Sequence, residues 1–296
     1  MKVFRCKKGT GANFILFSLL AADFGVLLLT KFIDVYVILS LIKIFLIILN
    51  GYGIYYIFLF LTLKYVVDNE KLNITGLWGL KNIYVPFSSI QGYKISKNRI
   101  NGMKLFGVGN GNFALGRYVV DKIGTTRIFV TCKSNIIYLK TNDINFSISP
   151  SEMERFTELL RKHDISPLEW EYSNPKEVHL HKERNFMIPF LAVSAVVFSL
   201  TIIPLIMYVK GVIPNEMPLS FNASFEPAKI GTARQFAFKQ MTFGVLNMAV
   251  LFCMYYAAHF HAKYDKKSAN RYIYISLIIS AVFFLMQLRT IFHYIV

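Results

Sequence analysis

Five long apolar runs dominate the pattern of hydrophobic and polar positions along the 296-residue chain. A helix that crosses a bilayer needs about 20 consecutive, mostly apolar residues. Two of the runs precede a polar stretch at 64–185, and three follow it. We therefore expect five membrane-spanning helices, which cover residues 13–30, 35–63, 186–209, 241–260 and 272–288.

The first part of the polar stretch changes to short runs rich in β-branched and aromatic residues, separated by turn residues. Such runs predict β-strands, and Gly124 between two of them predicts a tight hairpin. The glycine-rich run 107–111 is predicted as a loop, because a phosphate cradle would be followed by a helix and not by a strand pattern. The expected strands are 64–67, 71–77, 81–87, 89–95, 115–123, 125–132, 135–140 and 145–148.

An amphipathic helix is expected to close this β-rich part. Ser149, Pro150 and Glu152 stand in the order of a capping box, with serine at the N-cap, proline at the first helical position and glutamate three residues after the cap. Apolar residues then recur at helical spacing and can cover the open end of a bent sheet: Met153, Phe156, Leu159 and Leu160.

Several antiparallel strands followed by one amphipathic helix resemble the bacterial pleckstrin-homology domain. The residues that carry the resemblance are the strand at 84–90, the turn at 116–118 and the helix entry at 148–152. The resemblance implies a bent antiparallel sheet with a C-terminal helix. Eukaryotic domains of this kind bind inositol lipids through a basic motif in the first strand loop. Only Lys81 stands in the comparable place here, so that activity is not expected.

The fold class that follows is a multi-pass α-helical membrane protein with five spans and an inserted β-rich, pleckstrin-homology-like domain. We expect its parts in this order: an N-terminal tail and two-span hairpin at 1–63, the inserted domain at 64–165, a charged linker at 166–185 and a three-span membrane domain at 186–296.

The orientation is predicted from basic residues near the ends of the spans. The N-terminal tail carries four Lys and Arg and no acid, and the connection between the last two spans is also basic. We therefore expect a cell-membrane protein whose N-terminus and residues 64–185 are cytoplasmic. Its C-terminus and the polar segment at 210–240 then lie outside.

This outer segment, 210–240, offers a second resemblance, carried by residues 213–224 with Glu226, Pro227 and Gly231. It is similar to a short segment of unknown function that recurs in immunity proteins of the sporulation-delaying-protein type. Residues before prolines favour extended backbone, so the segment is expected to be ordered.

We predict that the outer segment faces an extracytoplasmic peptide, with Asn222, Glu226 and Arg234 as polar contacts. An interfacial cap over the helices is the alternative, because aromatic residues such as Phe221 and Phe225 suit the depth of the membrane interface.

The composition supports a membrane location. Hydrophobic residues make up 54% of the chain and charged residues 17%, whereas soluble domains carry about 25% charged residues. The net charge of +16 could also indicate nucleic-acid binding. The apolar excess makes the membrane surface the better partner, and no nucleic acid is expected.

The β-rich part is itself basic, with 12 Lys and Arg against four Asp and Glu over 64–147. A basic residue near an anionic leaflet contributes about 1 kcal/mol. We expect an anionic inner leaflet as one partner and a cytoplasmic protein as the other candidate; a solvated basic face is the simpler alternative. The residues expected to face the leaflet are Lys81, Lys94, Lys97, Arg99 and Lys104.

Two charges lie inside the first two apolar runs. Asp23 and Lys43 each stand ten positions from Ile33, the centre of the turn between the runs. At 1.5 Å of rise per residue both lie about 15 Å below the turn, so we predict that they pair. The alternatives are that the lysine snorkels to the interface, or that the long second span is broken near Asn50 and Gly51 and Lys43 lies higher.

No residue pattern indicates catalysis. The three cysteines are far apart in the sequence, and His259 and His261 are two positions apart on an expected helix, so they do not share a face. We expect no catalytic residue, no metal and no cofactor. The predicted function is non-enzymatic, in sensing, immunity or protein interaction; a small transporter or an accessory subunit of a membrane complex is the alternative.

Overall fold

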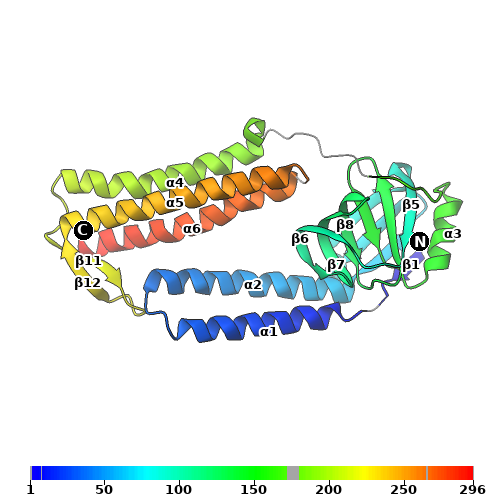
Figure 1. Cartoon of the computed structure of the whole chain (residues 1–296), viewed down its shortest axis with the longest axis horizontal. Coiled ribbons are helices and arrows are strands. Elements are labelled where there is room, and N and C mark those ends of the chain that lie inside the picture. Colours follow the sequence, from blue (N-terminus) through cyan, green and yellow to red (C-terminus); the bar gives the residue numbers. More distant parts are fainter. Residues whose placement is uncertain (1, 8, 172–179, 265, 296) are drawn as a thin grey trace. The chain divides into compact units, whose positions relative to one another are not determined.

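The computed structural model describes the whole chain except residues 1, 8, 172–179, 265 and 296 (Figure 1). Its contacts divide the chain into two compact units. The first unit contains Met1–Ala22 and Ile48–Pro175, and the second contains Asp23–Ile47 and Lys176–Val296. Part of the expected charged linker, 172–179, lies outside the described residues.

The first unit is built on two sheets. An antiparallel four-stranded sheet has the order β1-β2-β3-β4, and a six-stranded sheet has the order β5-β9-β10-β8-β7-β6, in which only β8 and β10 run parallel. The strands are β1 (Lys2–Arg5), β2 (Lys64–Val67), β3 (Lys71–Gly76), β4 (Lys81–Pro86), β5 (Ile90–Ser96), β6 (Gly102–Asn110), β7 (Phe113–Val120), β8 (Gly124–Val130), β9 (Ile136–Thr141) and β10 (Asn145–Ile148); short 3-10 turns lie at Leu77–Gly79 and Phe87–Ser89.

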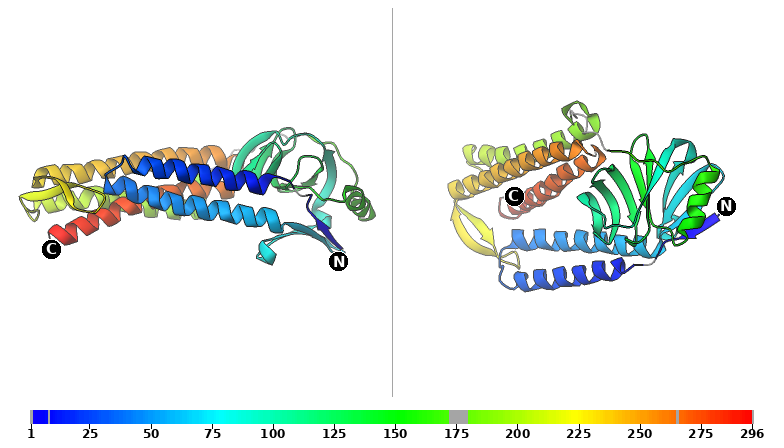
Figure 2. Two further views of the ribbon diagram at one scale, coloured as in Figure 1. Left: turned by 90° about the horizontal axis from the view of Figure 1, so that it is seen from below. Right: turned by 45° about the vertical axis from the view of Figure 1, so that its right-hand side comes forward.

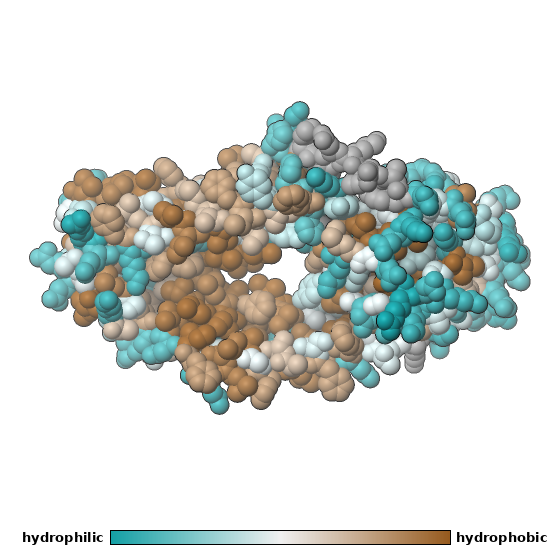
Figure 3. Space-filling view, viewed as in Figure 1, coloured by the Kyte–Doolittle hydropathy of each residue, from teal (hydrophilic) through white to brown (hydrophobic). Residues whose placement is uncertain are grey.

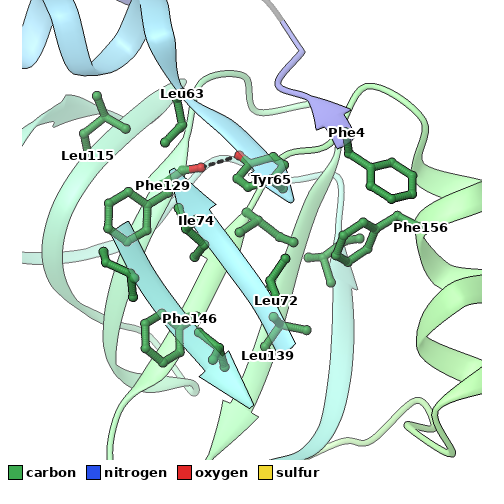
Figure 4. Close-up of a cluster of buried hydrophobic side chains, with 14 of the residues drawn as sticks. Phe4, Leu63, Tyr65, Leu72, Ile74, Leu115, Phe129, Leu139, Phe146 and Phe156 are labelled. Atoms are coloured by element: carbon green, nitrogen blue, oxygen red, sulfur yellow. Dashed lines mark hydrogen bonds between the residues drawn. The ribbon is translucent and has the colours of Figure 1, made fainter. Parts of the chain in front are cut away.

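The core lies where the inner faces of the two sheets meet the closing helix (Figure 4). Alternate residues of the strands point inward, which is the expected result of period-two patterning. Tyr65 is fully buried and satisfies its hydroxyl twice, because it donates to the carbonyl oxygen of Phe129 at 2.7 Å and accepts from the Ser149 amide at 2.9 Å. This pair of bonds ties β2 to β8 and to the end of β10.

The closing helix α3 (Met153–Lys162) packs as its apolar spacing predicts, with Phe156, Leu159 and Leu160 buried. The expected capping box is wrong, because α3 begins after Glu152 and has no side-chain cap. Ser149 is buried instead, and its hydroxyl accepts from the Thr131 amide at 2.9 Å. The residues before α3 therefore continue the sheet contacts, which outcompete the local cap.

The N-terminal tail also joins the sheet. Predicted as a tail, it forms strand β1, in which Phe4 lies opposite Tyr65. The ring of Phe4 meets the ring of Phe156 edge-on, with centroids 5.1 Å apart (Figure 4). The pairing joins residues far apart in the sequence, and the four-residue run alone gives little sign of it.

Most of the glycine-rich run predicted as a loop is a strand, and its last residue, Gly111, lies in the turn that follows. Gly107 and Gly109 lie in β6, which pairs with β7. Gly107 has a positive φ of 119°, and a Cβ there would overlap the carbonyl oxygen of Leu115. Glycine therefore permits a close approach of the two strands, and its low strand propensity misleads the prediction.

Five helices of the described residues are long and apolar enough to cross a membrane. In the space-filling view, apolar side chains gather over these helices, whereas the β-rich part is mostly hydrophilic (Figure 3). The helices are α1 (Gly11–Thr30), α2 (Tyr36–Thr62), α4 (Arg184–Val209), α5 (Ala233–Ala262) and α6 (Lys266–Tyr294), and a 3-10 turn at Leu180–Lys182 precedes α4.

In the second unit, α4, α5 and α6 pack together, and a hairpin of β11 (Glu216–Phe221) and β12 (Pro227–Thr232) connects α4 to α5 (Figure 1). The helix α5 begins eight positions before the expected span. Its N-cap is Thr232, whose hydroxyl accepts from the Gln235 amide while the Gln235 side chain accepts from the Thr232 amide. This capping box was not predicted, because the expected span was placed on the apolar run and the cap lies in the polar segment before it.

Candidate functional site

The first candidate site is the turn of the β11–β12 hairpin, because two of the three predicted contact residues meet there. The Asn222 side chain donates to Glu226 Oε2 at 3.0 Å, and its Oδ1 accepts from the amides of Ser224 and Glu226. Asn222 thus builds the turn, and its side chain has little freedom left to bind a ligand.

Arg234, the third predicted contact, belongs to another element. It is exposed in the first turn of α5, with its guanidinium 5.6 Å from the ring centroid of Phe238 in the same helix. The structure therefore brings Asn222 and Glu226 together and places Arg234 on the helix that follows the hairpin.

The turn is docked against the connection between α1 and α2, within the same unit (Figure 2). The amide of Ala223 donates to Asp34 Oδ1 at 3.0 Å. The ring of Phe225 packs edge-on against Tyr36, with centroids 4.8 Å apart, and stacks on Phe221 at 4.3 Å. The hairpin is therefore an ordered element with its own partners.

Arg289 of α6 completes this docking site. Its guanidinium lies 3.6 Å from the ring centroid of Phe225 and donates to the Tyr36 hydroxyl at 3.0 Å. A cation over an aromatic face contributes about 0.5–1 kcal/mol when exposed and about 2 kcal/mol when desolvated. Arg289 is not among the predicted contacts, and its one signal in the sequence is that it is a single basic residue directly after the last expected span.

A small cavity of about 60 Å³ lies beside the hairpin, between it and the helices of the second unit. Its lining is partly polar, with Ser220, Lys239, Gln240 and Gln287 among the residues that face it. Gln287 is buried and its Oε1 has no partner. A cavity of this size and polarity has room for a few water molecules.

The second candidate site is the set of basic residues predicted to face the leaflet, all in the first unit. Lys81 is half-buried; its ammonium donates to the Tyr55 hydroxyl at 2.6 Å and lies 5.5 Å from the ring centroid of Phe129. The Lys94 Nζ atom lies 4.0 Å from Glu169 Oε1. Both charges thus have partners in the protein, which reduces what they can offer to a lipid.

The other three residues of that set are exposed. Lys97 and Arg99 lie in the connection between β5 and β6, and Lys104 is on β6. Lys104 also lines an apolar cavity of about 210 Å³ with residues of α1 and α2. The expectation that these side chains face an anionic leaflet stays a prediction.

The two intramembrane charges lie on separate helices, as expected. Asp23 is half-buried on α1, and Lys43 is exposed on α2. Their pairing stays a prediction. Among the described residues, no group of three or more His, Cys, Asp and Glu is placed to hold a metal ion.

Comparison with known proteins identifies the β-rich part. The model of the bacterial PH domain family matches residues 63–164. An uncharacterized protein of Clostridium acetobutylicum is 40% identical over 254 residues, which cover 86% of each chain. The chain belongs to the family of that clostridial protein. No solved structure matches.

The bacterial PH domain confirms the first of the two resemblances. Together with the long apolar helices, it indicates a membrane-associated protein. The clostridial relative matches across most of both chains, so its family combines this domain with the apolar helices. The resemblance of the outer segment to immunity proteins stays a prediction.

Proposed function

We propose that this is a non-enzymatic, multi-pass cell-membrane protein that senses an extracytoplasmic peptide through the β11–β12 hairpin. Its bacterial PH domain would then contact a cytoplasmic protein. The observation that carries the proposal is the docking of the hairpin turn by Arg289, Tyr36 and Asp34. A plain connection between two helices does not require such contacts.

The docking supports the expected arrangement of loops. The connection of α1 to α2 and the hairpin are both predicted to lie outside the cell, and they contact each other through Asp34 and Ala223. Loops on opposite sides of a bilayer could not make this contact, because the hydrocarbon core is about 30 Å thick.

The hairpin also offers a way to hold a peptide. Strand β12 is exposed along most of its length, and Ile230 is 59% exposed. The hairpin is a two-stranded sheet, so β12 is an edge strand. An extended peptide can add to such an edge through main-chain hydrogen bonds, with side-chain contacts setting specificity. Binding there could shift the docking contacts of the turn and so reach α6 through Arg289.

The test compares Arg289→Gln with Lys263→Gln, which removes the same charge from an exposed position at the C-terminal end of α5. A strain that lacks the gene is challenged with the peptides secreted by its own culture, and growth is measured after complementation. We expect the wild type and Lys263→Gln to restore growth and Arg289→Gln to fail at equal protein level. Restoration by both variants, or normal growth without the gene, would contradict the proposal.

A further inference from the structure

An open cleft of about 450 Å³ lies in the first unit, where α1 begins and α2 ends. Its walls are the end of the N-terminal tail, the first turn of α1, the last turn of α2 and the start of β2, with Thr131, which directly follows β8. Three basic residues line it, Arg5, Lys7 and Lys64, and none of its described lining residues is acidic.

The sheet register places two of these charges face to face. Arg5 and Lys64 are directly opposite each other in the antiparallel pair β1–β2, and both are exposed. Like charges at opposed positions destabilise a strand pair. The strand β1 nevertheless forms here, and an anion in the cleft would turn this repulsion into attraction for both residues.

The thiol of Cys132 is affected by the positive charge of Lys7, one of the three basic residues of the cleft. Burial would raise the pKa of the Cys132 thiol, yet this pKa is lowered, because hydrogen bonds with Ser134 and the positive charges of Lys7 and Lys133 favour the thiolate. Lys7 thus places positive charge both at the cleft and at this thiol.

The position of the cleft points to the source of the anion. One side is apolar, with Phe60 and Leu61 at the end of α2 and Ala12 at the start of α1. Both helices are long and apolar enough to cross a membrane and end at the cleft. If α1 and α2 cross a bilayer, the cleft lies at the depth where the acyl chains end and the phosphates begin.

We propose that this cleft binds the phosphate-bearing headgroup of an anionic membrane lipid, with Arg5, Lys7 and Lys64 around the phosphate and the apolar wall against the glycerol and upper acyl chain. The volume falls within the range of about 300–1,000 Å³ that ligand pockets occupy. The proposal requires α1 and α2 to enter the bilayer and is independent of the role of the outer hairpin. None of its three residues belongs to the set that the sequence analysis expected to face the leaflet.

The test uses the full chain, delipidated in detergent, and native mass spectrometry with phosphatidylglycerol or phosphatidylcholine. We expect a bound phosphatidylglycerol that the triple variant Arg5→Gln, Lys7→Gln, Lys64→Gln weakens about a hundredfold, since each basic residue near an anionic headgroup contributes about a factor of five. The control variant Arg161→Gln, Lys71→Gln, Lys122→Gln removes equal charge from exposed positions outside the cleft and should bind as the wild type does.

Two further arms keep the outcome clear. Arg5→Glu removes the repulsion from Lys64, so it should raise the melting temperature of lipid-free protein while it abolishes the stabilisation by phosphatidylglycerol. Because this variant is expected to fold at least as well as the wild type, misfolding would not explain its loss of binding. Inorganic phosphate is the other arm, and it should not displace the lipid.

Three results would overturn the lipid assignment. These are equal binding of phosphatidylglycerol and phosphatidylcholine, an equal loss in the control variant, and displacement of the lipid by inorganic phosphate, which would make the cleft a free-phosphate site. Because the readout is lipid bound to purified protein, its failure is distinct from failure of the growth test on Arg289.

Discussion

The two units both have apolar cores, but they differ in the polar side chains that they bury and in the surface that they expose. The interior of the β-rich unit is apolar and aromatic, with Leu72 and Ile137 fully buried, while basic side chains lie on its surface. The interior of the α4–α6 bundle contains Asn247 and Gln287, both almost fully buried, while Leu285 on the same bundle is 65% exposed. The exposed apolar surface of these helices is visible in Figure 3.

This difference in surface is what is expected if the β-rich part folds in water and the apolar helices fold in lipid. In water, burial of apolar area is the main force that assembles a domain. In lipid the surroundings are as apolar as the side chains, so helices associate through small residues and interhelical hydrogen bonds. Pro204 shows the second mechanism, because it has no N–H for the carbonyl of Leu200, and Gln287 of α6 donates to that carbonyl at 3.0 Å.

The largest effect is expected from Phe156→Ala, which opens a cavity in the core of the β-rich unit. Phe156 is fully buried, and removing such a ring costs about 3–5 kcal/mol of unfolding free energy. Both tryptophans of the chain, Trp78 and Trp170, lie in the first unit. Their fluorescence in a urea titration of the detergent-solubilised protein therefore reports the loss.

The matched control is Phe198→Ala, the same change at a position of α4 that is 62% exposed. If α4 is solvated by lipid, this ring gains little from folding, and the helical bundle should lose almost no stability. A loss comparable to that of Phe156→Ala would contradict the contrast between the units.

The next effect tests the small residues of the bundle. A Cβ on Gly244 of α5 would overlap the hydroxyl oxygen of Thr201 on α4. Gly244→Leu should therefore force the helices apart and cost about 1–3 kcal/mol, measured as a shift of the SDS-induced loss of helicity. Gly51→Leu on α2 is the control, because a Cβ at Gly51 meets nothing within 4 Å, and it should cause no loss.

A smaller effect is expected from Gln287→Leu, which removes the donor to Leu200. Hydrogen bonds between helices in a membrane contribute about 0.6 kcal/mol on average and at most about 1.7 kcal/mol. Pro204→Ala returns a backbone N–H to the same carbonyl. The cost of Gln287→Leu should therefore fall toward zero in a Pro204→Ala background, as a double-mutant cycle can measure. Equal costs in both backgrounds would show that Gln287 acts elsewhere.

Local features of the fold could be predicted from the sequence. The bounds of β2 and β10 agree with the predicted ones, and the helices overlap the expected apolar runs. Hydrophobic periodicity and length determine these elements, and both are properties of short segments. The stripe of Phe156, Leu159 and Leu160 was predictable for the same reason.

Contacts between segments that are far apart in the sequence could not be predicted from it. Strand β1 was missed because its four residues become a strand only by pairing with β2 and packing Phe4 on Phe156. Arg289 was missed because its partners, Tyr36 and Phe225, are far away in the sequence. The predicted cap at Ser149 is wrong for the same reason. The Ser149 hydroxyl, which was expected to cap α3, accepts instead from the distant amide of Thr131.

The last prediction concerns cysteine reactivity instead of stability, and it compares directly the parts of the chain expected in water and in lipid. The pKa of the Cys132 thiol is lowered, although burial opposes this, through Ser134, Lys7 and Lys133. Burial raises the pKa of Cys6 to about 12. Because the thiolate is the reactive form, a water-soluble alkylating reagent near neutral pH should modify Cys132 first, while Cys6 stays protonated and unreactive until the pH approaches about 12.

Cys253 makes this comparison sharp, because it is exposed on α5. If only protein covered side chains, the exposed Cys253 should be modified by the reagent in the discs. If α5 is solvated by lipid, a charged maleimide will leave Cys253 unmodified in protein reconstituted into bilayer discs and will reach it after unfolding in SDS. Peptide mass spectrometry counts the modification at each cysteine. Rapid labelling of Cys253 in the discs would mean that this face of α5 meets water, and the contrast between the two units would then have to rest on protein packing alone.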